Sequence, residues 1–173
     1  MFRILLYVAG AVIAAIVIVL ALSARTYTPP FVDGTGKTLP NSIAEERRIV
    51  LGGWDQYVLV RSRNKANPIL LFVHGGPGTP EMPLVRVYNN DLENDFVFVN
   101  WDQRGTGKSY ASNIDPKTIT LDQITRDLDQ LVDQLRAEFG KSKVLFVCHS
   151  WGTQLCLSYL AQHANKASAY IAI

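Results

Sequence analysis

The hydrophobic and polar positions of the chain form two different patterns. Near the amino terminus, Ile4 to Leu22 is one uncharged run of 19 residues. From Arg47 onward, short apolar runs alternate with glycine-rich or polar stretches. Strands that are buried on both faces read as continuous apolar runs, so the second pattern predicts a mostly parallel sheet with helices on each side.

The short runs are the expected strands. Two β-prone runs, 49–51 and 56–61, are separated by Gly-Gly-Trp-Asp, which predicts an antiparallel hairpin at the start of the sheet. Continuous apolar runs follow at residues 68–73, 96–99, 143–147 and 169–173. Because the last run reaches the end of the chain, we expect the sheet to be incomplete on its carboxyl-terminal side.

The connections between these strands carry helical patterns. Apolar residues follow helical spacing over 121–139, with a capping-box pattern at 120–123 and Gly140 as the stop. A second helix is expected at 151–163, and residues 82–92 are a candidate for a third. The predicted fold class is therefore α/β, doubly wound, opened by an antiparallel hairpin.

The amino-terminal run has the length of a membrane span. As a helix, Ile4 to Leu22 rises about 28 Å, close to the thickness of the hydrocarbon core of a bilayer. We expect a transmembrane signal-anchor helix at 4–22 after an N-terminal tip at 1–3. A buried globular helix is the weaker alternative, because such helices rarely lack polar residues on every face.

A cleaved signal peptide is the stronger alternative to the anchor. Ala21, Ser23 and Ala24 are small residues near the position where a signal peptidase would cut. The basic residues on the two sides of the run do not settle its orientation. With only a short tip before the run, we expect a single-pass membrane protein with its domain on the non-cytoplasmic side, or a secreted protein if the segment is cleaved.

The remaining chain divides into a linker and one domain. Residues 23–45 are rich in Pro, Gly and Thr, which is typical of a linker, and 46–173 form the predicted domain. The net charge is only +2 and the basic residues are scattered, so we expect no nucleic-acid partner.

The two cysteines, Cys148 and Cys156, lack the spacing of metal ligands, and we expect neither a metal nor a cofactor. Small apolar packing is the role we expect for both cysteines. A disulfide between them outside the cytoplasm is the less favoured alternative, because they lie eight residues apart across a strand-to-helix bend.

Residues 147–154, Val-Cys-His-Ser-Trp-Gly-Thr-Gln, mark a strand that turns sharply into a helix at Ser150. In the pattern Gly-x-Ser-x-Gly, such a turn exposes the hydroxyl of a nucleophilic serine, and the residues two positions away must be small. Gly152 meets that demand, and Cys148 meets it less well. An ordinary serine N-cap is the simpler interpretation of this stretch alone.

A second motif, His-Gly-Gly-Pro-Gly at 74–78, follows the predicted strand 68–73. Its glycines let the backbone approach a bound group and direct N–H donors at it, as in an oxyanion loop. A phosphate cradle is less favoured, because no Gly-Lys-Ser/Thr follows and Pro77 interrupts the spacing of a dinucleotide site. A plain tight turn remains the other alternative.

Three stretches in this order resemble the α/β-hydrolases, and within them the proline iminopeptidase-like branch. They are His-Gly-Gly-Pro-Gly at 74–78, Asp-Gln-Arg-Gly-Thr-Gly-Lys-Ser at 102–109 and His-Ser-Trp-Gly at 149–152. The resemblance covers residues 46–173. The chain departs from the branch at Cys148, where the branch usually has glycine.

The resemblance implies that Ser150 is a nucleophile and that the backbone N–H groups of Gly76 and Trp151 form an oxyanion hole. It implies a structural role for residues 102–109. The residues that it implies as support for the elbow and the loop are His74, Gly75, Pro77, Gly78, Cys148 and Gly152.

No residue of the chain is an obvious base for Ser150. In this fold the serine is followed along the chain by Asp or Glu and then by His, but only His163 follows Ser150, with no acidic residue. His163 falls on the order of 15–20 Å from the start of its helix, too far to reach. We expect His149 to point to the other side of the turn and His74 to bond nearby backbone.

We therefore expect the triad Asp and His to lie outside this chain. The chain is then the N-terminal part of a longer enzyme and nearly inactive by itself, because a serine without its base retains only the catalysis of the oxyanion hole and of binding.

The expected function is a membrane-anchored serine hydrolase that cleaves ester or amide bonds through an acyl-serine. Its substrates are small molecules or peptides, and by resemblance an aminopeptidase-like activity is favoured. The alternatives are a lipase or esterase of the same fold, or a non-catalytic membrane-tethered binding module. Epoxide hydrolases are not favoured, because they have an aspartate where this chain has Ser150.

Overall fold

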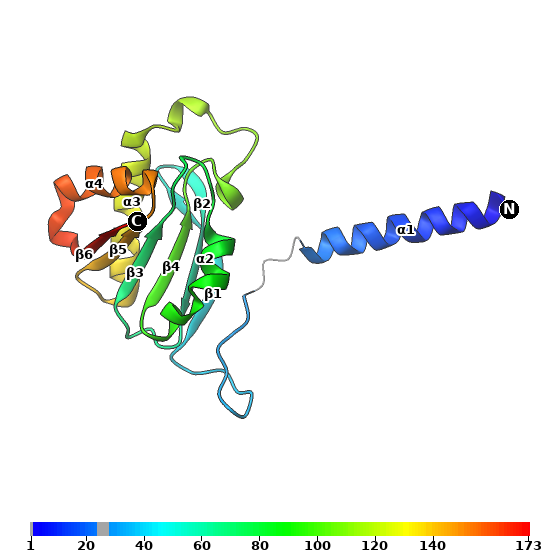
Figure 1. The fold of residues 1–173 in the computed structure, drawn as a ribbon, viewed down its shortest axis with the longest axis horizontal. Coiled ribbons are helices and arrows are strands. Elements are labelled where there is room, and N and C mark those ends of the chain that lie inside the picture. The colour runs from blue at the N-terminus through cyan, green and yellow to red at the C-terminus, as the bar shows by residue number, and fades with distance from the viewer. Residues whose placement is uncertain (1, 24–27) are drawn as a thin grey trace.

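The computed structural model describes residues 2–23 and 28–173 (Figure 1). The amino-terminal run forms the helix α1, Phe2–Ser23, as predicted. Within the described residues, however, no helix is both long enough and apolar enough to cross a membrane. The expectation of a transmembrane helix at 4–22 is therefore not supported.

One six-stranded sheet forms the centre of the domain, in the order β1-β2-β4-β3-β5-β6 (Figure 1). The strands are β1 (Ile43–Leu51), β2 (Trp54–Ser62), β3 (Ile69–Val73), β4 (Val97–Asp102), β5 (Val144–Cys148) and β6 (Ala167–Ala172). The pairs β1–β2 and β2–β4 are antiparallel, and the remaining neighbours are parallel. The predicted mostly parallel sheet opened by a hairpin is confirmed.

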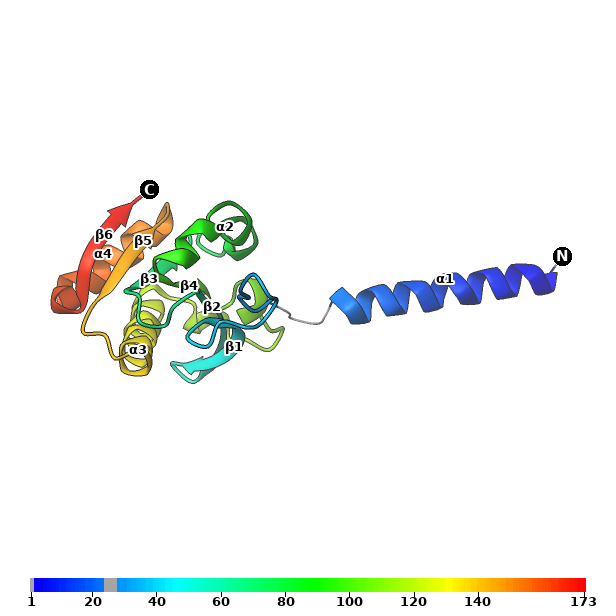
Figure 2. The same ribbon diagram turned by 90° about the horizontal axis from the view of Figure 1, so that it is seen from below.

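Helices cover both faces of this sheet, as Figures 1 and 2 show. The helix α2 (Met82–Tyr88) lies on one face, while α3 (Leu121–Phe139) and α4 (Trp151–His163) lie together on the other. The predicted third helix is shorter than residues 82–92, because a separate 3₁₀ turn forms at 90–94.

The predicted ends of α3 are confirmed. The Thr120 hydroxyl accepts the Gln123 N–H at 3.2 Å, and Gly140 ends the helix with φ 62°. Only half of the capping box forms, because the Gln123 side-chain oxygen accepts from Arg126 instead of from the Thr120 N–H.

Side chains of the strands alternate between two apolar clusters. On the face of α3 and α4, fully buried Leu71, Val99 and Phe146 pack with helix residues such as Leu128 and Leu155. On the other face, a smaller cluster joins Leu70 and Phe98 to Val85 of α2. This alternation explains why β3, β5 and the first half of β4 are continuously apolar.

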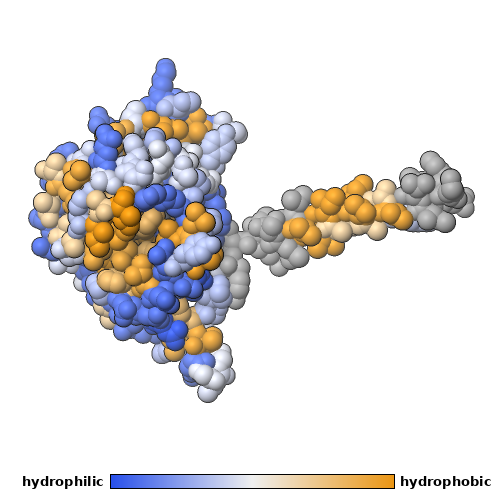
Figure 3. Space-filling model, in the orientation of Figure 1, coloured by the Kyte–Doolittle hydropathy of each residue, from blue (hydrophilic) through white to orange (hydrophobic). Residues whose placement is uncertain are grey.

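The α2 face of the sheet is covered unevenly. Leu145 and Val147 of β5 are only partly buried there. β6 forms an edge of the sheet; Ile171 in this strand is 48% exposed, and Ile173, just after it, is 65% exposed. The space-filling view shows apolar surface on this side of the domain (Figure 3).

Part of the segment that was expected to be a linker packs against the domain. Phe31 is buried, and the guanidinium of Arg61 lies 4.5 Å from the centre of its ring. Val32 forms an isolated β-bridge with Thr38, and β1 begins at Ile43. The segment around Pro29 and Phe31 thus lies against Arg61 of β2.

Candidate active site

Ser150 occupies the sharp turn between β5 and α4. Its backbone has φ 53° and ψ −120°, and among the described non-glycine residues it is the only one with a positive φ. Its side chain forms no capping hydrogen bond with the first turn of α4. Since an N-cap normally has extended backbone angles and accepts such a bond, the geometry is that of a strained elbow rather than of an N-cap.

Close approach of strand and helix dictates the residue at position 152. A Cβ atom built on Gly152 would lie 2.4 Å from the Val73 carbonyl oxygen and 2.7 Å from that of His74. Both neighbours are backbone atoms that cannot move aside. Glycine is therefore required here, as the elbow pattern predicts.

The bonding of Cys148 differs from the expectation drawn from the sequence. Cys148 and Cys156 are both fully buried and form a disulfide, with their Cα atoms 6.6 Å apart. The favoured expectation of two unbridged packing residues is wrong. After the sharp turn, α4 folds back over the end of β5, which brings two positions eight residues apart within the range of a disulfide.

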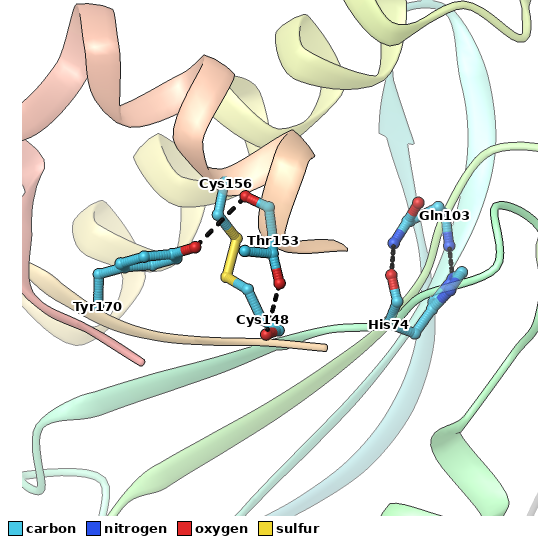
Figure 4. Close-up of a disulfide and its surroundings, with 6 residues drawn as sticks. All are labelled: His74, Gln103, Cys148, Thr153, Cys156 and Tyr170. Atoms are coloured by element: carbon cyan, nitrogen blue, oxygen red, sulfur yellow. Dashed lines mark hydrogen bonds between the residues drawn. A yellow bond between two sulfur atoms is a disulfide. The ribbon is translucent and has the colours of Figure 1, made fainter. Parts of the chain in front are cut away.

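Further bonds surround the disulfide (Figure 4). The Thr153 hydroxyl donates to the Cys148 carbonyl at 3.2 Å, and the Tyr170 hydroxyl donates to the Thr153 carbonyl at 3.4 Å. The Ser150 N–H donates to the Ile173 carbonyl at 2.8 Å. The elbow is thus held by α4 and by the end of β6.

The glycine-rich loop 74–78 packs directly against Ser150. A Cβ atom on Gly75 would lie 2.8 Å from the Ser150 Cβ and 3.0 Å from the His149 carbonyl oxygen, so a larger residue would separate loop and elbow. Gly76 has φ 115°, a conformation that side chains rarely permit.

Two amides at this junction have no internal acceptor. In the described part of the chain, neither the Gly76 N–H nor the Trp151 N–H donates to another residue. Trp151 is the first residue of α4, where the positive end of the helix dipole favours a negative group. Among the described residues, both amides are therefore available to a bound group.

His74 has a structural environment. It is 2% exposed; its Nε2 accepts the Gln103 N–H at 3.1 Å, and its carbonyl accepts from the Gln103 side chain at 2.8 Å (Figure 4). Its Nδ1 lies 3.0 Å from the Gly75 carbonyl. Burial lowers the pKa of the His74 imidazole, so the ring is neutral at pH 7 and fastens the glycine loop to the loop after β4.

The loop after β4 is held by its own polar side chains. Asp102 accepts the Lys108 N–H at 2.9 Å, and the Ser109 hydroxyl donates to the Asp102 carbonyl. Arg104 forms a buried ion pair with Asp127 of α3, Nε to Oδ2 2.8 Å. These contacts agree with the structural role that the resemblance implies for residues 102–109.

One contact at the site was not expected from the sequence. The His149 Nδ1 lies 2.7 Å from a carboxylate oxygen of Glu81, whose side chain is 14% exposed. Glu81 immediately precedes α2, so this contact joins the start of α2 to the elbow. No sequence signal marked Glu81, because its role depends on the path of the loop.

The third histidine lies away from the elbow. His163 is the last residue of α4, where its ring stacks on Tyr159 at 4.8 Å and its Nδ1 lies 3.7 Å from Asp129. Each of the three histidines therefore has another partner. Among the described residues, no group of His, Cys, Asp and Glu could hold a metal ion.

A strained serine between a strand and a helix, packed under a glycine-rich loop, defines the class of α/β proteins that carry a nucleophile-elbow geometry. A family model described as alpha/beta hydrolase fold matches residues 68–173, and the chain therefore belongs to that family. Its relatives place it in the proline iminopeptidase-like part of the family, as the sequence motifs predicted.

Among these relatives, the probable aminopeptidase YbaC of Bacillus subtilis is 39% identical over 132 residues, which cover 76% of this chain. The proline iminopeptidase of Neisseria gonorrhoeae is 33% identical over 59% of this chain. The crystal structure of a proline iminopeptidase-related protein from Thermus thermophilus superposes with a TM-score of 0.64 at 27% identity and covers 75% of this chain.

The chain spans less than half of the relatives that it matches. The matched region covers 42% of the Bacillus protein, 31% of the Neisseria protein and 44% of the Thermus chain. An epoxide hydrolase from Vigna radiata, with a TM-score of 0.61 at 23% identity, shares the fold.

Proposed function

We propose that the chain carries the nucleophile and the oxyanion hole of a serine hydrolase that cleaves ester or amide bonds through an acyl-serine. Ser150 attacks the substrate carbonyl, and the Gly76 and Trp151 amides stabilise the negative oxygen that develops. The observation that carries this proposal is the strained backbone of Ser150 directly against Gly75. A residue in such a conformation persists only where the surrounding structure enforces it.

Peptides are the proposed substrate class, with cleavage near the amino terminus. The support comes from relatives that are named as aminopeptidases or proline iminopeptidases. The proposed oxyanion hole would bind only the oxygen of the reacting carbonyl. The substrate class is therefore assigned from these relatives alone.

The base that accepts the Ser150 proton is proposed to come from a part of the enzyme beyond this chain. The three histidines of the chain contact other groups, and His74 is neutral, buried and bound on both ring nitrogens. The chain also spans less than half of its relatives. By itself it should therefore hydrolyse substrates very slowly.

We also propose that the domain is held on the non-cytoplasmic side of a membrane, or is secreted after cleavage of the amino-terminal segment. The support is the uncharged sequence Ile4–Leu22 and the buried disulfide, because disulfides persist in oxidising compartments. Extraction with alkaline carbonate separates the two forms: an anchored protein stays in the pellet, and a cleaved one is released.

A fluorophosphonate that reacts with activated serines tests the nucleophile. The full-length protein, which includes the part that supplies the base, should become labelled at Ser150. Mass spectrometry of its peptides would locate the label, and Ser150→Ala should abolish it. Ser158→Ala, also on α4, is the matched control and should label like the wild type. Labelling that survives Ser150→Ala, or its absence from the folded wild type, would refute the proposal.

A further inference from the structure

We propose that the Cys148–Cys156 disulfide is a positioning device that holds Ser150 in its reactive conformation. This inference rests on the proposed role of Ser150 as a nucleophile. In the pattern Gly-x-Ser-x-Gly, a small residue at the position of Cys148 lets strand and helix approach closely. In this chain, a covalent bond from that position holds strand and helix together.

The position of the bond supports this assignment. Cys148 is the last residue of β5, two positions before Ser150, and Cys156 lies in the second turn of α4. The bond therefore closes a short loop that contains the entire elbow. Both sulfur-bearing residues are fully buried, so the bond lies between strand and helix rather than at the surface.

The elbow needs such a constraint because its backbone is strained. A non-glycine residue at φ 53° and ψ −120° lies outside the favoured regions and costs of order 1–3 kcal/mol. Hydrogen bonds add to this constraint. The Gly152 N–H donates to His149, the Thr153 hydroxyl to Cys148 and the Ser150 N–H to Ile173. The His149 N–H donates to Val73, and the His149 ring contacts Glu81.

Two side-chain hydrogen bonds next to the elbow depend on the placement of α4 relative to the sheet. The Thr153 hydroxyl reaches the Cys148 carbonyl only while the first turn of α4 stays over the end of the strand (Figure 4). Tyr170 of β6 then donates to the Thr153 carbonyl. Loss of the disulfide would let α4 shift, and this shift would weaken both hydrogen bonds of Thr153.

Burial also determines when the bond can be broken. A dithiol reductant would give up two electrons and two protons, becoming a disulfide itself while Cys148 and Cys156 become thiols. Its thiolate must first reach a sulfur, and both cysteines are inaccessible in the folded domain. The bond should therefore form during folding under an oxidant and then resist reduction until the domain opens.

The test compares variants of the full-length protein at a temperature well below the melting point of each. Cys156→Ala and Cys148→Ala/Cys156→Ala should lower the fluorophosphonate labelling rate of Ser150 on the order of ten-fold, because small misplacements of a reacting group are costly. The double variant Cys148→Gly/Cys156→Ala, which restores glycine to the elbow, should recover most of the rate. Ser158→Ala is the control for a change elsewhere on α4.

A readout without chemistry separates this inference from the proposed function. Amide hydrogen exchange at residues 149–153 should be at least several-fold faster in Cys156→Ala, while exchange in α3 stays unchanged. A lower melting point with unchanged labelling and unchanged exchange would mean that the bond only stabilises the fold, and would overturn the inference. If the wild type is folded but never labelled, the proposed function fails, and the positioning of a nucleophile fails with it.

Discussion

At the scale of single residues, close contacts around the site leave no space for a larger side chain. Gly152 illustrates this, because the nearest neighbours of an added Cβ atom are the carbonyl groups of Val73 and His74. We expect Gly152→Ala to lower the free energy of unfolding by about 3 kcal/mol, since overpacking against rigid atoms costs about 1–3 kcal/mol. Gly34→Ala is the matched control, because a Cβ atom there meets nothing within 4 Å. Urea denaturation measures both; equal values for the two variants would contradict the elbow geometry.

The protonation of His74 makes the stability of the domain depend on pH. Burial lowers its pKa below the ordinary 6.5, so the unfolded chain binds a proton on this ring at a higher pH than the folded domain does. The free energy of unfolding should therefore decrease as the pH falls below about 6.5. Urea melts at pH 7.5 and pH 5.5 measure the decrease. His74→Gln should show a smaller one, and an equal slope in both proteins would show that another group is responsible.

Some of these residue roles could be predicted from the sequence and others could not. The turn at Ser150, the glycine at 152 and the backbone bonding of His74 follow from local motifs. The disulfide and the Glu81–His149 contact do not, because they depend on the angle at which α4 leaves β5 and on the path of the loop before α2. Both are decided by the packing of elements rather than by spacing along the chain.

Among the elements, α3 is fastened to the sheet by a buried ion pair. Asp127 accepts from Arg104, Gln56 and Gln123, which come from three different segments. Removing one partner of such a pair leaves a buried charge without compensation.

We expect Asp127→Ala to lower the free energy of unfolding by about 3–5 kcal/mol, because the Arg104 guanidinium would stay buried. Asp133→Ala, on the same helix but half exposed, should cost less than about 1 kcal/mol. Guanidinium denaturation of the two variants gives the comparison. Similar losses in both would mean that the buried pair contributes no more than a surface pair.

The apolar runs and the helical spacing made most strands and helices predictable, including the ends of α3 and α4, but the ends of β1 and β4 were not predictable. β4 continues through Asn100, Trp101 and Asp102, beyond the apolar run, because these residues pair with β2 and, up to Trp101, with β3. The Trp101 side chain also donates to Gln56 at 2.9 Å. β1 extends back to Ile43 because it pairs with β2 over its whole length, although its charged residues hide the strand pattern.

At the scale of the whole molecule, the apolar surface at the β6 edge of the sheet predicts how the domain associates. β6 is an edge strand with exposed Ile171, next to partly buried side chains of β5. Unpaired apolar edges favour pairing with other chains. We expect residues 24–173 to self-associate at micromolar concentration.

Size-exclusion chromatography with light scattering measures this association. Ile171→Lys should reduce it, because a charge on an edge strand opposes pairing. Val50→Lys, which changes an exposed apolar residue at the opposite end of the sheet, is the control and should leave association unchanged. A wild-type monomer that melts cooperatively would contradict the expectation.

The order of the strands also sets the order in which the domain can assemble during synthesis. β4 lies between β2 and β3, so neither strand can pair with it until β4 has been synthesised. The other side of β3 stays open until β5 has been translated, far along the chain. Contacts between such distant segments form slowly and leave strand edges exposed in the meantime. The nascent chain therefore carries β3 with one side unpaired until the segment that bears Ser150 emerges, and only then can the glycine-rich loop meet the elbow.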